Sequence, residues 1–493
     1  MPVRLGKSDE GFSEINFHKT MSKDIADMYD FVIIGSGPAG HSAAIRAAQL
    51  GLKTAVIEKN SAMFGGVCLN EGCIPAKSLY HNAKKFNIIK NGFPEVGLDV
   101  NCGVVNLGML VKKSRQDTAV LRKGLEYLFR KNKIDLFFGH AKFVNSNTVS
   151  IDGKSGKPIQ LEAKKFLIAT GSFPVGLKEG VFDGKRIITS SKGIRLTETP
   201  KTILIAGCGA IGTEFASFFN SIGSEVVMVE AESYILPGED KDVSLRMQSI
   251  LAKKGVRFYI SSRIKKIMAL KDRVEVFIGG ETEEKKVECE MVLVSVGRKP
   301  ATFGLDLEKA GVEIDSDGYI PVQSASMRTN VDHIYAAGDV LRTPMLAHTA
   351  SAEGETAVEA SAGMHTEAID YSAVPNVVYS EIQSASVGLT EKAAKEKDLN
   401  ITVGKYFFKS NGFAIISGET EGFIKIIANA DDRSLVGVHI VGYRAAELIH
   451  EFVLAKKAGI TVDNIGKTVH AHPTFSETIQ DACKSVFGGA LYG

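Results

Sequence analysis

The feature that most constrains the fold is an internal repeat, in which residues 29–58 are matched by residues 201–230. Each copy begins with a short apolar run, turns at a GxGxxG motif, continues with small and apolar residues, and closes with a second apolar run. This order predicts a strand, a helix that starts at the glycines, and a second strand. The matched positions are Gly35 and Gly207, Gly37 and Gly209, Gly40 and Gly212, Gly51 and Gly223, and Glu58 and Glu230.

Each copy has the residues that a dinucleotide needs. The first glycine allows a tight turn, the second lets the pyrophosphate approach the backbone, and the third brings the helix against the strand. The carboxylate at the end of the second strand accepts hydrogen bonds from a ribose. One such motif alone is weak, and two glycine turns without ligands are the alternative. Two complete units favour two dinucleotides in one chain, with electron transfer between them.

The second unit is expected to take NAD rather than NADP. Glu230 would repel a 2′-phosphate, and the next two residues, Ala231 and Glu232, offer no cation to bind it.

Composition excludes several classes of protein. Of the 493 residues, 44% are apolar and 24% charged, and 59 Lys and Arg nearly balance 57 Asp and Glu, so the net charge is +2. These values argue against a disordered chain and against a nucleic-acid partner. No run approaches the ~18 consecutive apolar residues of a membrane span. Residues 1–28 mix both charge signs without an apolar core, so we expect an N-terminal extension and a cytoplasmic protein, the mitochondrial matrix being the less favoured location.

A cysteine pair follows the first unit in the sequence GGVCLNEGCIPAK. Cys68 and Cys73 are too widely spaced for a CxxC motif, yet an irregular helical turn would let them form a dithiol and disulfide couple. Zinc binding and two inert cysteines are the alternatives, but no Cys or His cluster at ligand spacing lies nearby, so no metal is expected. Lys77 lies one helical turn beyond Cys73, where its cation would face the same site unless it is a surface lysine.

Two further motifs carry candidate polar groups. In HAHPTFSE, near the C-terminus, Glu477 follows His472 closely enough to orient its imidazole, and a histidine held by a carboxylate is a plausible general base. In HIYAAGDV, a short apolar strand ends at Asp339, which is placed to accept a hydrogen bond from a ligand hydroxyl.

Together these residues resemble the flavoprotein disulfide reductases over roughly residues 29–487. ATG at 169–171, VGRKP at 296–300 and MLAH at 345–348 fit the same family. The resemblance implies an α/β fold with two Rossmann-like dinucleotide-binding domains and a C-terminal α+β dimerisation domain. The implied order is the extension 1–28, an FAD-binding domain 29–175, an NAD-binding domain 176–300, a segment 301–372 that completes the FAD site, and an interface domain 373–493.

The resemblance also implies roles for single residues. Cys68 would exchange with the substrate, the Cys73 thiolate would face the flavin, and His472, oriented by Glu477, would act as base in the partner subunit of a homodimer. The residues implied for FAD are Gly35, Gly37, Pro38, Gly40, Glu58, Lys77, Ala141, Thr170, Asp339, Met345, Leu346, Ala347 and His348. Those implied for NAD are Gly207, Gly209, Gly212, Glu214, Glu230, Gly297 and, as a less certain neighbour, Ile264.

Within this family the likeness is strongest to the enzymes that oxidise dihydrolipoamide with NAD. It implies, as partners, the lipoyl domains of 2-oxoacid dehydrogenase complexes or of the glycine cleavage system. Glutathione and trypanothione reductases would favour NADPH, mercuric reductases would end in vicinal cysteines, and soluble transhydrogenases lack the cysteine couple. A flavin-bearing subunit kept for complex assembly would have lost some catalytic residues.

Two residues depart from the family pattern. Glu71 stands where an apolar residue is usual, and Ala76 where a serine is usual. The charge of Glu71 is expected to raise a thiol pKa or to alter substrate access.

Overall fold

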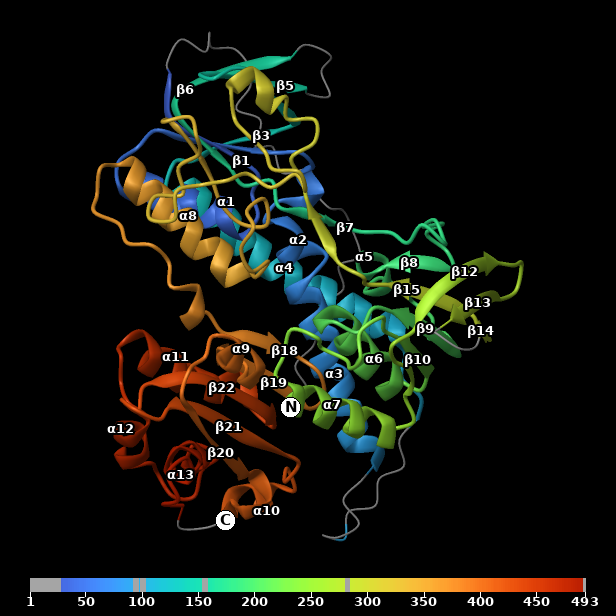
Figure 1. Cartoon of the computed structure of the whole chain (residues 1–493). Helices are drawn as coiled ribbons and strands as arrows, with labels where there is room; N and C mark the ends of the chain where they lie inside the picture. The colour runs from blue at the N-terminus through green and yellow to red at the C-terminus, as the bar shows by residue number, and fades with distance from the viewer. Residues whose placement is uncertain (1–27, 92–96, 98–102, 153–157, 280–283, 491–493) are drawn as a thin grey trace, which may run out of the picture.

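The computed structural model describes residues 28–91, 97, 103–152, 158–279 and 284–490. The predicted extension, except for Met28, lies outside the described residues. Three bodies are visible in Figure 1, two of them α/β and the third an antiparallel sheet with helices. The predicted fold class is confirmed.

The first repeat forms the centre of a seven-stranded sheet. Strand β1 (Tyr29–Ile34) lies between β2 (Thr54–Glu58) and β6 (Ile159–Ile168), parallel to both, and α1 (Pro38–Gln49) connects β1 to β2. The β1 side chains Phe31, Val32 and Ile33 are fully buried, which fits a central strand covered on both faces. The remaining strands are β3 (Asp135–Phe138), β4 (His140–Asn145), β5 (Thr148–Asp152) and β17 (Ile334–Ala336).

Strand β17 joins this sheet from a distant part of the sequence. It pairs with β6 in parallel, so Ala336 and the residues after it reach the same sheet edge as the end of β1. Helix α8 (Ala347–Ser361) then packs against α1, as Figure 1 shows. Parallel strands bring their carboxyl ends together, and ligands bind there in open α/β sheets.

The second repeat forms a five-stranded parallel sheet. Strand β9 (Thr202–Ala206), helix α6 (Ala210–Ser221) and β10 (Glu225–Val229) repeat the first unit. The strand order is β11-β10-β9-β15-β8, and a three-stranded antiparallel sheet lies beside it in the order β12-β13-β14. The bounds are β8 (Ile187–Thr189), β11 (Arg257–Tyr259), β12 (Arg263–Ala269), β13 (Val274–Gly279), β14 (Glu284–Cys289), β15 (Met291–Val294), α5 (Ser190–Gly193) and α7 (Lys241–Lys253).

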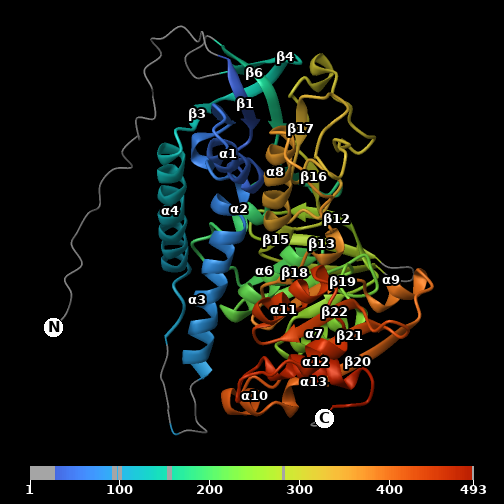
Figure 2. The same ribbon diagram turned by 90° about the vertical axis from the view of Figure 1, so that its left-hand side faces the viewer.

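Helix α3 (Cys73–Asn91) links the two nucleotide units physically. It packs on α4 (Leu107–Lys131), and the two helices run side by side in Figure 2. On another side α3 contacts α6, and its residues Ala76 and Leu79 are buried in one core with Phe215 of that helix. The start of α3 therefore lies where the two units meet.

The third body is a five-stranded antiparallel sheet in the order β18-β19-β22-β21-β20. Its strands are β18 (Asn376–Val378), β19 (Gln383–Gly388), β20 (Ile401–Phe407), β21 (Gly422–Asn429) and β22 (Leu435–Gly442). Its helices are α9 (Glu391–Glu396), α10 (Gly412–Ser417), α11 (Ala445–Lys457), α12 (Val462–Lys467) and α13 (Glu477–Ser485). Short strands β7 (Ser172–Pro174) and β16 (Arg298–Pro300) pair between the two α/β bodies.

A buried lysine joins the third body to the second. Lys425 on β21 is 2% exposed, and its Nζ lies 2.9 Å from Asp240, 2.9 Å from Asp242 and 2.7 Å from Glu391. Burial lowers the pKa of Lys425, but its hydrogen bonds to the three carboxylates outweigh burial and raise the pKa. Because Asp240 and Asp242 belong to the start of α7, this charge cluster fixes the sheet against the second body, which contains β9 and β10.

We expect Lys425→Met to destabilise the protein by about 3–5 kcal/mol, because the carboxylate of Asp240 would stay buried without its cation. The measurement is the midpoint of urea unfolding. Lys405→Met is the matched control: Lys405 also contacts Asp242, at 2.8 Å, but is 31% exposed. Equal midpoints for the two variants would contradict this account.

Candidate active site

The predicted disulfide is present. Cys68 lies in the short helix α2 (Gly66–Asn70), Cys73 is the first residue of α3, and the two are bonded with a Cα to Cα distance of 4.7 Å. Both residues are partly exposed. The position of Cys73 at the N-terminus of a 19-residue helix favours its thiolate, because the helix dipole is positive there.

One turn along α3, Lys77 forms an ion pair with Glu214 of α6. Its Nζ donates to both carboxylate oxygens at 2.9 Å, and Glu214 also accepts from the backbone N–H of Tyr379 at 2.8 Å. Burial raises the pKa of Glu214, although Lys77 and Tyr379 counteract it. The pair therefore ties the redox helix to α6 and to the third body. The resemblance assigned Lys77 to FAD and Glu214 to NAD, and the structure brings the two side chains into contact.

The first glycine turn is shaped to hold a dinucleotide. Gly35 has φ +107°, and a Cβ there would lie 2.2 Å from the carbonyl oxygen of Ala169. A Cβ on Gly40 would lie 1.9 Å from the Gly35 oxygen, whereas one on Gly37 would meet only Gly66, at 3.9 Å. Helix α1 begins at Pro38 without a side-chain cap, which leaves its first N–H groups available for a pyrophosphate.

Glu58, which ends β2, lies beside this turn. It is 8% exposed and accepts hydrogen bonds from the N–H and Oγ of Ser36, at 3.2 and 2.5 Å, and from the N–H of Asn60 at 3.1 Å. These contacts hold a carboxylate at the sheet edge where an adenosine ribose would lie. The residues present fit FAD.

The other residues assigned to FAD gather at this sheet edge. Thr170 donates to Ala301 at 2.8 Å, and Asp339 follows β17 and accepts from Ser172 at 2.5 Å. Ala141 is buried on β4, and Met345, Leu346, Ala347 and His348 lie before and at the start of α8.

The sequence analysis assigned no role to three polar residues at this edge, Ser172, Arg298 and Glu353. Arg298 donates to Ser172 at 2.7 Å and so extends the contact to Asp339. Glu353 accepts from the N–H of Gly338 at 2.7 Å, and burial raises its pKa. The positions of these residues follow from tertiary packing. Of the sequence motifs, only VGRKP at 296–300 contains one of them, Arg298.

The second glycine turn repeats the first. A Cβ on Gly212 would lie 2.0 Å from the oxygen of Gly207, whereas one on Gly209 would have open space around it. Glu230 accepts from the N–H groups of Cys208 at 2.7 Å and Glu232 at 3.0 Å. Gly297 has φ +137° and also faces open space, and Ile264 on β12 packs against the apolar core beside β9 and β10. These residues fit a second dinucleotide, NAD.

The two glycines should therefore respond differently to substitution. We expect Gly212→Ala to lower the melting temperature of the unliganded protein, because its methyl group would overlap a backbone oxygen. We expect Gly209→Ala to leave the melting temperature unchanged but to weaken NAD binding at least tenfold, because its methyl group would fill space meant for the pyrophosphate. Thermal unfolding and NAD titration measure the two effects, and full NAD affinity in Gly209→Ala would contradict the site.

The candidate base and its carboxylate lie together. Nδ1 of His472 is 2.8 Å from Glu477 Oε1, and Glu477 Oε2 accepts from the N–H of Thr474 at 2.8 Å. Burial raises the pKa of Glu477, but the hydrogen bonds from Thr474 and His472 and the nearby charges together outweigh burial and lower the pKa. A carboxylate at this position would hold a proton on Nδ1 and leave Nε2 of His472 as the nitrogen that can accept one.

Within one chain the base does not reach the disulfide. The His472 side chain is 79% exposed, and Nε2 has no hydrogen-bond partner among the described residues. In Figure 1, α13, which begins at Glu477, lies in the third body, far from α2 in the first. The two halves of the predicted site are therefore separate in a single subunit.

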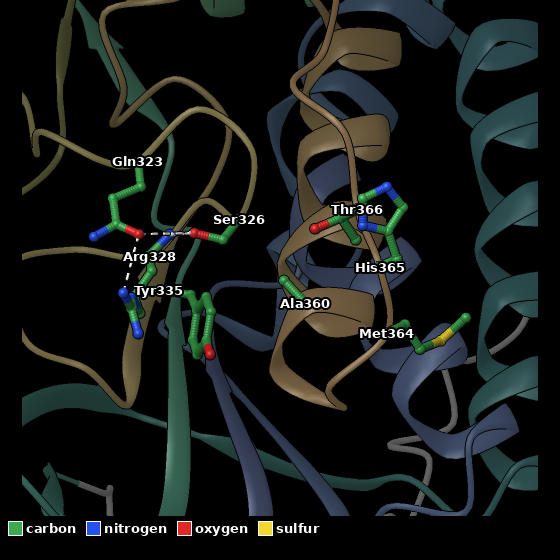
Figure 3. A pocket seen from close by; sticks show the side chains of 8 residues that line it. All are labelled: Gln323, Ser326, Arg328, Tyr335, Ala360, Met364, His365 and Thr366. Atoms are coloured by element: carbon green, nitrogen blue, oxygen red, sulfur yellow. Dashed lines mark hydrogen bonds between the residues drawn. The ribbon is translucent and has the colours of Figure 1, made fainter.

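Over the described ranges, no three His, Cys, Asp or Glu side chains form a potential metal site, and no helix is long and apolar enough to cross a membrane. A cavity of about 350 Å³ lies between β17 and the C-terminal end of α8, lined by residues that include Arg328, Tyr335 and His365 (Figure 3). Neither the disulfide nor the base lines it.

Comparison with known proteins agrees with this geometry. The model of the pyridine nucleotide-disulphide oxidoreductase family matches residues 29–354, and the dimerisation domain of the same family matches residues 374–483. The chain belongs to the pyridine nucleotide-disulphide oxidoreductases. The predicted family is confirmed, and with it a dimer built on the C-terminal domain.

Relatives within the pyridine nucleotide-disulphide oxidoreductases extend over nearly the whole chain. The mitochondrial dihydrolipoyl dehydrogenase 2 of Arabidopsis thaliana is 41% identical over 95% of this chain and 92% of its own length. Dihydrolipoyl dehydrogenase 3 of Pseudomonas putida is 38% identical over 94% of this chain and 99% of its own. The flavoprotein disulfide reductase RclA of Escherichia coli has a TM-score of 0.84 at 26% identity, covering 93% of this chain and 99% of that structure. This chain is an FAD- and NAD-dependent disulfide oxidoreductase.

Proposed function

We propose that this protein is a dihydrolipoyl dehydrogenase, which oxidises dihydrolipoamide to lipoamide and reduces NAD. The observation that carries the proposal is the Cys68–Cys73 disulfide at the start of α3, where the two dinucleotide units meet. Similarity to dihydrolipoyl dehydrogenases over most of the chain selects this substrate among those of the family.

The chemistry follows from the positions of the two sulfurs. A substrate thiolate attacks Cys68 Sγ, the Cys68–Cys73 bond breaks, and Cys73 leaves as a thiolate stabilised by the start of α3. The second substrate thiol then attacks the substrate sulfur of the mixed disulfide, which closes lipoamide and breaks the bond to Cys68, and the proton of that thiol passes to the Cys68 sulfur. His472 takes the proton of the first substrate thiol at Nε2 and is oriented by Glu477 through Nδ1. Bound FAD supplies the path by which the two electrons reach NAD as hydride.

We infer that each active site is completed by the partner subunit. His472 is exposed, its Nε2 has no partner within the described chain, and it lies in the domain that matches a dimerisation model. A two-fold axis would present each His472 to the other subunit's disulfide and so form two equal sites.

The nucleotide assignments are part of the same proposal. Residues 29–175 with 301–372 would hold FAD, residues 176–300 would hold NAD, and residues 373–493 would form the interface. We propose the lipoyl domains of 2-oxoacid dehydrogenase complexes or of the glycine cleavage system as partners. We also propose a cytoplasmic location, supported by the bacterial relative, whereas the plant relative supports the mitochondrial matrix.

We expect His472→Gln to slow dihydrolipoamide oxidation by about two to four orders of magnitude while FAD stays bound, because glutamine cannot take the substrate proton. Steady-state NADH formation and the flavin absorbance measure the two effects. His470→Gln is the control, since His470 contacts Glu451 at 3.2 Å and its side chain is 6% exposed. Wild-type turnover in His472→Gln would remove this residue from the mechanism.

The test of the function is an anaerobic titration of the FAD-loaded protein. Dihydrolipoamide should reduce the enzyme with a long-wavelength thiolate-to-flavin band, and NAD should then yield NADH. A protein that is reduced by NADH but not by dihydrolipoamide would keep the oxidoreductase family and exclude this substrate.

A further inference from the structure

The turn between the two cysteines carries a charge that the proposed mechanism does not use. Glu71 lies three residues after Cys68 and two before Cys73, and its side chain is 23% exposed. A carboxylate this close to two thiols disfavours their ionisation, because the thiolate and the carboxylate repel each other. A cation that pairs with the Glu71 carboxylate would reduce this repulsion and so favour ionisation of the thiols.

The cation is Arg195. Its Nη2 lies 2.5 Å from Glu71 Oε1. Arg195 follows α5 on the second body, where its N–H donates to the Lys192 oxygen at 2.9 Å. The preceding residue, Ile194, is 4% exposed and shares a core with Ala76 of α3. The arginine therefore extends from a well-anchored backbone across the contact between the two bodies.

Ion pairs also lie on the helices around this turn. The elements packed against α2 and α3 include α4 and α6. Ion pairs on these helices include Lys77 with Glu214, Arg122 with Glu126, and Lys113 with Asp117. Arg195 is the cation that the structure records on Glu71 within the described residues.

Reduction makes this contact more important. While the disulfide is closed, a covalent bond holds α2 to the start of α3. Once it opens, the turn keeps its backbone bonds, such as that from the N–H of Glu71 to the Val67 oxygen, and the side-chain bonds of Asn70 to Phe64 and Gly66. All of these lie within the first body, whereas the Glu71–Arg195 pair ties the turn to the second.

We propose that Arg195 is a positioning residue of the redox site: its ion pair with Glu71 neutralises the carboxylate in the turn that joins the two cysteines and holds the reduced turn against the second body. This inference deepens the proposed function and rests on the dithiol chemistry at Cys68 and Cys73. Ala76 supports the same contact, because it is 6% exposed and buried in the core that also contains Ile194.

The test is the pH dependence of thiol alkylation in the FAD-loaded protein, reduced with a phosphine and treated with iodoacetamide between about pH 5 and pH 9. Alkylation of Cys68 and Cys73 is quantified by peptide mass spectrometry. We expect Arg195→Met to shift the profile to higher pH and to slow alkylation about threefold below the thiol pKa, because Glu71 would be left unpaired. The double variant Glu71→Val with Arg195→Met should return to the wild-type profile.

The control is Arg433→Met, which removes an arginine of equal exposure, 47%, from a surface pair with Asp463. Three results would overturn the proposal. The profile of Arg195→Met could match that of this control, or it could move to lower pH. The third such result is that adding Glu71→Val fails to restore the wild-type profile. Alkylation needs no dihydrolipoamide. A wrong substrate assignment therefore leaves this result intact, and a failed pairing leaves the substrate assignment intact.

Discussion

In the proposed mechanism the Cys68–Cys73 disulfide and the His472 base must meet, yet one chain holds them in separate bodies. This constraint explains much of the architecture. The base needs a rigid support, and Glu477 at the start of α13 holds the His472 side chain in place. The disulfide also needs a rigid support, and Cys73 begins helix α3, which is held between the two nucleotide units. In the proposed mechanism, dimerisation would bring the disulfide and the base together.

Charged groups at the contacts between the bodies hold the disulfide helix α3 and the antiparallel sheet in place. Lys77 and Glu214 join α3 to α6, and Lys425 joins the antiparallel sheet to the start of α7. Removing one member of such a buried pair leaves an uncompensated charge, so the contacts resist sliding more than apolar packing alone would. Electron transfer from sulfur to nucleotide depends on the relative orientation of the bodies. A fixed orientation is therefore needed at these contacts.

Much of the two nucleotide units was predictable because their signals are local. The glycines, the helix that follows them and the closing carboxylate lie within thirty residues of one another, and their geometry depends on backbone space, as the Gly35 and Gly40 contacts show. The disulfide and the family likewise followed from short motifs. The third body was expected from the family resemblance alone, because its strands have no motif of their own.

Contacts between distant segments were not predictable from the sequence. Nothing in the sequence around Ser172 indicates that it lies between Arg298 and Asp339, and nothing near Arg195 indicates that it contacts Glu71. Glu71 was expected to raise a thiol pKa or to alter substrate access, and the structure pairs it with Arg195, from a segment more than a hundred residues away. Such pairings depend on how the bodies pack, which no local pattern encodes.

The most direct test of the account is the activity of a mixed dimer. Subunits carrying Cys73→Ser and subunits carrying His472→Gln are given different affinity tags, co-expressed, and purified over both tags so that only mixed dimers remain. If each disulfide uses the partner's base, one of the two sites is intact, and the mixed dimer should show about half the wild-type rate of dihydrolipoamide oxidation while both parent dimers are inactive. A mixed dimer as inactive as its parents would contradict the shared site.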